Sequence, residues 1–159
     1  MEAIQDFLPD DYLLELGHIA VQWSFFESVL DLCLTKLANI DIYDPRSMII
    51  FTHITTPLKL DIFAAMCAEL EGNYPRLKTY KDVLIKINAA KDARNKFVHA
   101  KWGIHEKTSQ VEISRVSAHG KLKYSTEPIH LSKLRSASEI IHQAAVALHQ
   151  LVISSGDIS

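Results

Sequence analysis

The sequence contains little of what cofactor-dependent and membrane proteins need. Only five glycines occur among 159 residues, and none forms a P-loop, a Gly-rich dinucleotide turn or a GxSxG elbow. No apolar run approaches the roughly 20 residues that span a bilayer, and the acidic start MEAIQDFLPDD is unlike a secretory signal. We therefore expect a cytoplasmic protein with no transmembrane helix and no cofactor.

Cysteine and metal-ligand motifs are scarce too. Cys33 and Cys67 belong to no CxxC pair, and each lies in an apolar helical pattern, which favours buried thiols over a disulfide. The histidines form no HxxxH or HExxH motif. His142 and His149 share a predicted helix face but lack an acidic or cysteine companion, so we expect no metal site.

Length and composition indicate one globular domain, which we place at residues 1–159. Hydrophobic residues make up 48% of the chain and charged residues 23%. The net charge of −2 excludes a generally basic nucleic-acid coat, yet the charges are unevenly distributed. Residues 1–44 carry nine acids and one lysine, whereas residues 76–101 carry eight basic residues and two acids. One segment of the chain is therefore markedly cationic.

Apolar residues recur at helical spacing in most of the chain. This period predicts a long helix from about residue 10 to 40 and a last helix from about Ser132. Asp44-Pro45 and Thr56-Pro57 each resemble an N-cap followed by proline, and they predict the starts of two shorter helices. A fourth helix is predicted after Pro75, ending between residues 100 and 103.

Period-two alternation replaces the helical pattern at about residues 103–129. The turn-prone residues 117–120 divide this stretch, which predicts a β-hairpin or a short three-stranded insert. We expect the tail at residues 154–159 to fray. The predicted fold is thus mainly α, a helical bundle with a small β-hairpin insert before the last helix.

Two charged residues interrupt predicted core stripes. Glu27 lies on the apolar face of the first helix, and Arg94 lies on that of the fourth. A buried charge without a partner costs several kcal/mol, by order of magnitude, so we expect these two side chains to pair across a helix interface. Such a pair could be a structural salt bridge or part of a functional site.

The cationic fourth helix ends in the string RNKFVH. Asn95 and His99 are four residues apart and share a helix face, whereas Arg94 is rotated by about 140° from His99 on an ideal helix. The string resembles the R-N-x-x-x-H form of the RxxxxH motif of HEPN-domain ribonucleases and toxins. The first helix with Trp23-Ser24-Phe25-Phe26-Glu27 strengthens the resemblance to bacterial members of this family, and we therefore expect an HEPN-like bundle.

The resemblance implies a homodimer that cuts single-stranded RNA without a metal. In this chain His99 would move a proton of the 2′-hydroxyl or of the leaving 5′-oxygen, Arg94 would stabilise the phosphorane, and Asn95 would orient one of them. Glu27 would hold Arg94 from behind. The lysines expected to attract the RNA backbone are Lys91, Lys96 and Lys101.

One branch of the family continues the motif as H-x-Y, and a nucleotidyltransferase partner modifies that tyrosine. Lys101 occupies the position here, so adenylylation at this site is not expected. A toxin or defence effector restrained by a protein antitoxin or another regulatory partner remains an expectation. The alternative is a non-catalytic helical interaction module or a nucleotide-sensing module, in which Glu27 and Arg94 form a structural ion pair.

Overall fold

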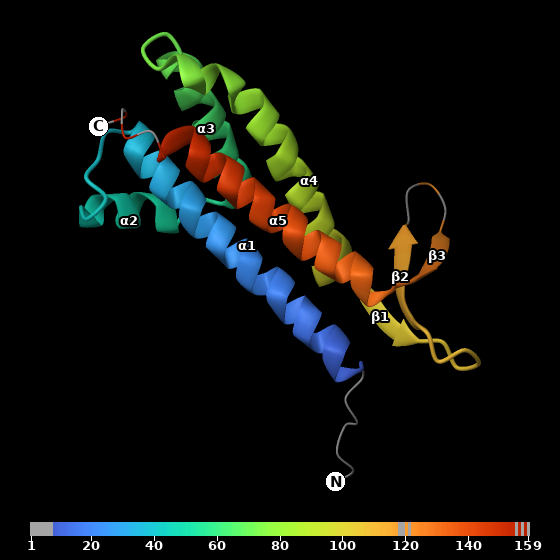
Figure 1. The fold of residues 1–159 in the computed structure, drawn as a ribbon. Coiled ribbons are helices and arrows are strands. Elements are labelled where there is room, and N and C mark those ends of the chain that lie inside the picture. The colour runs from blue at the N-terminus through green and yellow to red at the C-terminus, as the bar shows by residue number, and fades with distance from the viewer. Residues whose placement is uncertain (1–7, 118–119, 121, 155, 157, 159) are drawn as a thin grey trace.

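The structure, a computed structural model, describes residues 8–117, 120, 122–154, 156 and 158. It is mainly helical, with a small antiparallel sheet before the last helix (Figure 1). In chain order the elements are α1 (Asp10–Leu37), α2 (Pro45–Thr52), α3 (Thr56–Leu70), the 3-10 helix η1 (Pro75–Thr79), α4 (Tyr80–Val98), β1 (Lys101–Ile104), β2 (Val111–Ser117), β3 (Lys123–Pro128) and α5 (Leu131–Val152). The mainly helical class with a β-insert before the last helix is confirmed.

Helix α5 lies between α1 and α4 and packs against both (Figure 1). Its apolar residues recur every three or four positions, so they form one face that is removed from water. Burial of such side chains contributes roughly 25 cal/mol per Å² of apolar surface. Fully buried residues of this helix include Ile141, Ala144 and Leu148, which share one core with Ile19, Phe26 and Leu30 of α1 and Ile87 of α4.

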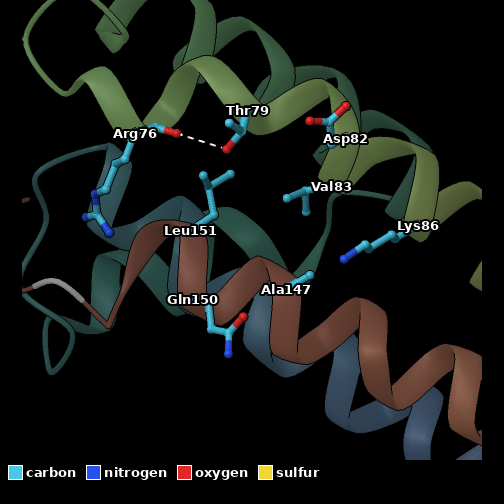
Figure 2. Close-up of a pocket in the computed structure, with 8 residues that line it drawn as sticks. All are labelled: Arg76, Thr79, Asp82, Val83, Lys86, Ala147, Gln150 and Leu151. Carbon is cyan, nitrogen blue, oxygen red and sulfur yellow. Dashed lines mark hydrogen bonds between the residues drawn. The ribbon is translucent and has the colours of Figure 1, made fainter.

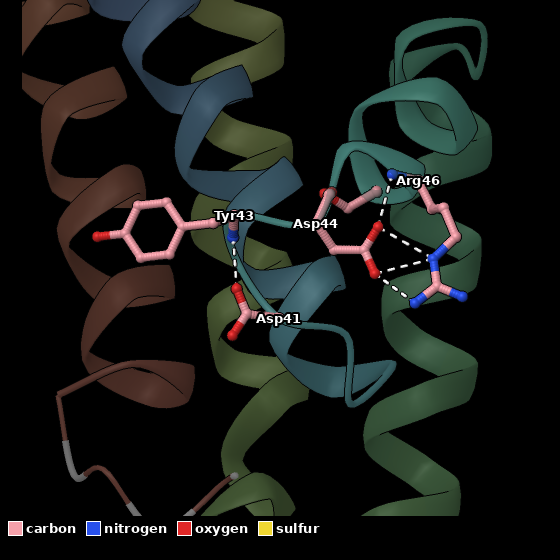
Figure 3. Close-up of polar contacts among 5 residues, drawn as sticks. Asp41, Tyr43, Asp44 and Arg46 are labelled. Atoms are coloured by element: carbon pink, nitrogen blue, oxygen red, sulfur yellow. Dashed lines mark hydrogen bonds and ion pairs between the residues drawn. The ribbon is translucent and has the colours of Figure 1, made fainter.

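The first predicted helix cap is confirmed, and the second is wrong. The Asp44 carboxylate accepts a hydrogen bond of 2.9 Å from the backbone N–H of Arg46 and also pairs with the Arg46 guanidinium (Figure 3). Helix α3 has Thr55 as its N-cap, with no side-chain cap bond. Thr56 is already the first residue of the helix, and its hydroxyl donates to Glu27 Oε1 at 2.6 Å.

The β-insert is a three-stranded sheet in the order β1-β2-β3 and begins at Lys101, slightly earlier than predicted. Lys101 pairs with Ser114, whereas β3 accompanies β2 from Glu112 to Ser117. Strand β2 therefore extends beyond the start of β1. Of the predicted turn at 117–120, Ala118 and His119 lie outside the described residues, and Gly120 has a positive φ of 76° that glycine adopts without strain.

Three contacts attach the sheet to the helices. The Glu127 carboxylate of β3 accepts hydrogen bonds from Lys133 of α5 at 2.7 Å and from Lys96 of α4 at 3.0 Å. Ile113 of β2 is buried in the helical core. The Tyr12 hydroxyl donates to the Ile129 carbonyl at 2.8 Å, which joins the start of α1 to the start of α5. The sheet is thus held beside the end of α4.

Both cysteines are buried free thiols, as predicted. Burial raises the pKa of the Cys67 thiol to about 12, and burial likewise raises the pKa of Cys33. Of the tail expected to fray, residues 155, 157 and 159 lie outside the described part, whereas Ile158 is buried. No helix in the described ranges is long and apolar enough to cross a membrane.

The Glu127 bridge predicts a pH dependence of stability. Hydrogen bonds from Lys133 and then Lys96 lower the pKa of Glu127 to about 2. Its stabilising effect is therefore complete above the ordinary pKa of about 4.3 and is lost as the pH falls through about 2. Because the carboxylate is partly exposed, Glu127→Gln should lower the free energy of unfolding at pH 7 by about 1 kcal/mol or less.

Urea unfolding at several pH values measures this effect. The difference between wild type and Glu127→Gln should narrow between about pH 5 and pH 2. Glu106→Gln, at an exposed position of the β1–β2 loop, is the control and should change little. A Glu127→Gln difference that is constant over this range would contradict the assigned bridge.

Candidate functional site

The last turn of α4 brings the predicted motif residues together. The helix ends at Val98, and His99 is its C-cap residue with φ −102° and ψ 7°. The Trp102 indole N–H donates to the Phe97 carbonyl at 3.0 Å, in addition to the backbone N–H of Ala100 at 3.4 Å. The chain then turns directly into β1. His99 is thus the first residue after the last turn of the helix.

Arg94, Asn95 and His99 form one polar cluster. Arg94 Nη1 donates to Asn95 Oδ1 at 3.1 Å and lies 3.3 Å from His99 Nε2. A guanidinium has only donors, so a hydrogen bond here requires Nε2 without a proton, and hence a neutral imidazole protonated at Nδ1. Asn95 and His99 are exposed, and Arg94 is half-buried. The cluster is therefore open to a ligand.

Arg94 packs on Trp23 and does not pair with Glu27. Its guanidinium carbon lies 5.4 Å from the centre of the Trp23 ring, a distance that allows a cation–π interaction. Among the described residues no ion pair joins Glu27 to Arg94. The predicted pair is thus wrong, because Glu27 accepts from Thr56 at the start of α3, where the positive end of the helix dipole also favours a carboxylate.

An open hollow of about 460 Å³ adjoins this cluster, between the end of α4 and the overhanging part of β2. Asn95 and His99 line it, together with the predicted RNA-binding residues Lys96 and Lys101. The third predicted lysine, Lys91, is not among the lining residues. The complete lining is Asn95, Lys96, His99, Ala100, Lys101, Ser114, Arg115 and Val116.

Arg115 was not predicted as a site residue. It lies on β2 at an exposed position and lines the hollow opposite the end of α4. The sequence places it in a period-two segment, but periodicity does not reveal which end of a hairpin lies against the helix. The one available signal is its positive charge in a segment already interpreted as a β-insert.

A second hollow, of about 360 Å³, lies between η1 and α4 on one side and α5 on the other (Figure 2). Asp82, Lys86 and Arg76 are its charged lining residues. The Arg76 guanidinium donates to the Val152 carbonyl at 3.0 Å, and the Arg76 carbonyl accepts from Thr79. This hollow contains none of the predicted site residues, and a carboxylate accompanies its cations.

The remaining candidate residues lie away from the cluster. His142 stacks on Phe25, with ring centres 6.5 Å apart, and its Nδ1 lies 3.3 Å from Gln22 Oε1. Of the aromatic residues in this part of α1, Trp23 and Phe26 are buried in the core, whereas Phe25 is half exposed. Within the described ranges, no three His, Cys, Asp or Glu side chains gather as metal ligands would.

Comparison with known proteins gives no match: no family model, no curated protein and no solved structure is similar to this chain at a significant level.

The contacts of Arg94 predict the outcome of two double-mutant cycles. Glu27→Gln and Arg94→Ala should be additive within about 0.5 kcal/mol, since among the described residues no hydrogen bond or ion pair joins the two side chains. Trp23→Leu and Arg94→Ala should show a coupling of about 0.5–2 kcal/mol, the usual range of a cation–π interaction. The free energy of unfolding in urea measures both cycles. A Glu27–Arg94 coupling larger than that of Trp23–Arg94 would contradict the assigned contacts.

Proposed function

We propose that the protein is a metal-independent endoribonuclease of the HEPN type that cleaves single-stranded RNA by attack of the 2′-hydroxyl. The observation that carries the proposal is the contact of Arg94 Nη1 with both Asn95 and His99 at the rim of a hollow lined by cations. A cationic guanidinium beside an imidazole offers the two functions that phosphodiester cleavage needs, charge stabilisation and proton transfer.

The attack step of the proposed reaction uses these side chains alone. A bound phosphodiester would compete for the Arg94 guanidinium and release His99 Nε2, which then accepts the proton of the 2′-hydroxyl. The 2′-oxygen forms a bond to phosphorus while the bond from phosphorus to the 5′-oxygen breaks. The products are a 2′,3′-cyclic phosphate and a 5′-hydroxyl. Arg94 stabilises the charge of the phosphorane, and Asn95 orients the guanidinium through its 3.1 Å hydrogen bond.

A second copy of the chain would supply the other proton transfer. The leaving 5′-oxygen departs on the side opposite the attacking oxygen and requires a proton donor there. The cluster contains one imidazole, that of His99, and the neighbouring Lys96 and Lys101 line the same hollow. Two such clusters facing each other in a homodimer would provide a base on one side of the phosphate and an acid on the other.

The alternative of a non-catalytic module depends on Arg94 as a structural ion-pair partner. Glu27 is bound to Thr56, and Arg94 lies at a half-buried position on Trp23 next to an open hollow. This placement favours the catalytic proposal. A role as toxin or defence effector, with an antitoxin or other protein that restrains the nuclease, is the corresponding biological proposal.

Cleavage of a labelled single-stranded RNA in excess EDTA tests the proposed function. Wild type should cut and leave 2′,3′-cyclic phosphate ends, and Arg94→Ala should lower kcat by at least about a hundredfold, a typical loss for one group that stabilises an oxyanion. His99→Ala should lose activity to a similar or greater extent. His149→Ala is the matched control, because that histidine lies at the far end of α5 and should be dispensable.

Folded wild-type protein that leaves a broad set of RNAs intact in EDTA would contradict the proposal. Equal activities of wild type and His99→Ala would also refute the assigned site, because the cleavage would then come from another group or a contaminant.

A further inference from the structure

The hollow beside His99 has an unusual charge balance. Of its eight lining residues, three are Lys or Arg and none is Asp or Glu. Three other hollows of the described structure contain a carboxylate in their lining: Asp82 between η1 and α5, Asp11 at the start of α1 and Asp31 beside α2. A concave surface lined by cations and free of acids raises the local concentration of anions.

Two of the three cations have no partner among the described residues. The Lys96 ammonium is neutralised by Glu127 at 3.0 Å, which also accepts from Lys133. In the described part of the chain, neither the Lys101 ammonium nor the Arg115 guanidinium takes part in a hydrogen bond or an ion pair. Their charges are thus available to a ligand.

The sheet register explains how Arg115 reaches the hollow. Side chains alternate between the two faces of a strand, so Arg115 shares a face with Ile113, which is buried against the helices. Arg115 therefore projects from the inner face of β2, beyond the last pair formed with β1. Lys101, which is paired with Ser114, starts from the opposite face and lines the hollow from the side of β1. If the pairing continued two residues further, Val116 would lie opposite His99. The part of β2 that extends beyond its pairing with β1 thus forms one wall of the hollow.

We infer that Arg115 and Lys101 form a phosphate-binding subsite for the RNA phosphate next to the one that is cleaved. The inference rests on the proposed ribonuclease function, because it takes the Arg94, Asn95 and His99 cluster as the position of the scissile phosphate. Arginine binds phosphate through two parallel N–H groups, and lysine adds a point charge. The β-insert thereby contributes directly to substrate binding. Lys96, which pairs with Glu127, lies where the sheet meets α4.

Binding of RNA without cleavage tests the subsite. A fluorescein-labelled single-stranded RNA of mixed sequence is titrated with protein carrying His99→Ala, and anisotropy is recorded at several KCl concentrations. Adding Arg115→Gln should raise Kd at least fivefold and should reduce the slope of log Kd against log salt by about 0.7, the value for one phosphate contact on a single strand. Lys101→Gln should act in the same direction, and Arg115→Lys should lie between wild type and Arg115→Gln.

Lys107→Gln is the matched control. It removes one positive charge from the exposed β1–β2 loop, at the other end of the ribbon, and should leave Kd within about twofold. Thermal unfolding of each variant confirms that the sheet has folded. Unchanged Kd and salt slope in both Arg115→Gln and Lys101→Gln would overturn the subsite, as would the absence of RNA binding by the parent protein.

The two proposals fail in different ways. RNA binding that depends on Arg115, together with a wild type that never cleaves, would support the subsite and refute the nuclease. Cleavage by wild type with Arg115→Gln equal to it in both Kd and kcat/KM would support the nuclease and refute the subsite.

Discussion

Helix α5 buries its apolar face against α1 and α4 at the same time, and the positions of the other elements follow from this contact. Removal of Ile141, Ala144 and Leu148 from water fixes α4 beside α1, so that the Arg94 guanidinium lies over the Trp23 ring. The start of α5 also fixes the sheet, because β3 leads directly into it and Glu127 connects Lys133 with Lys96. The packing of the helical core therefore determines where the end of α4 and the cationic hollow lie.

The motif residues come together at the end of α4. In a continued helix Arg94 and His99 would be rotated by about 140° from each other. The helix stops at Val98, the Trp102 indole donates to the Phe97 carbonyl, and the imidazole lies within 3.3 Å of the guanidinium. The three motif side chains therefore meet where the helix gives way to a strand.

Features governed by local physics could be predicted from the sequence. The helical stripes, the Asp44 cap and the switch to period two all depend on residues a few positions apart, and the structure contains them. Features that depend on which residues meet in the folded chain could not be predicted in this way. Glu27 had two possible partners, and the sequence could not show that the Thr56 hydroxyl would be the one in reach. Arg115 became a candidate only when the register of β2 and its position beside α4 were known.

The most direct test of the account is whether RNA engages the imidazole of His99. Protein labelled with ¹⁵N-histidine is titrated with a 2′-O-methyl oligonucleotide, which binds like RNA but cannot be cleaved, and the ring nitrogen resonances are followed by NMR. We predict that binding shifts the Nε2 resonance of His99, whereas the ring resonances of His142 and His149 stay unchanged. A His99 resonance unaffected by saturating oligonucleotide would contradict the assignment of this cluster as the RNA-cleaving site.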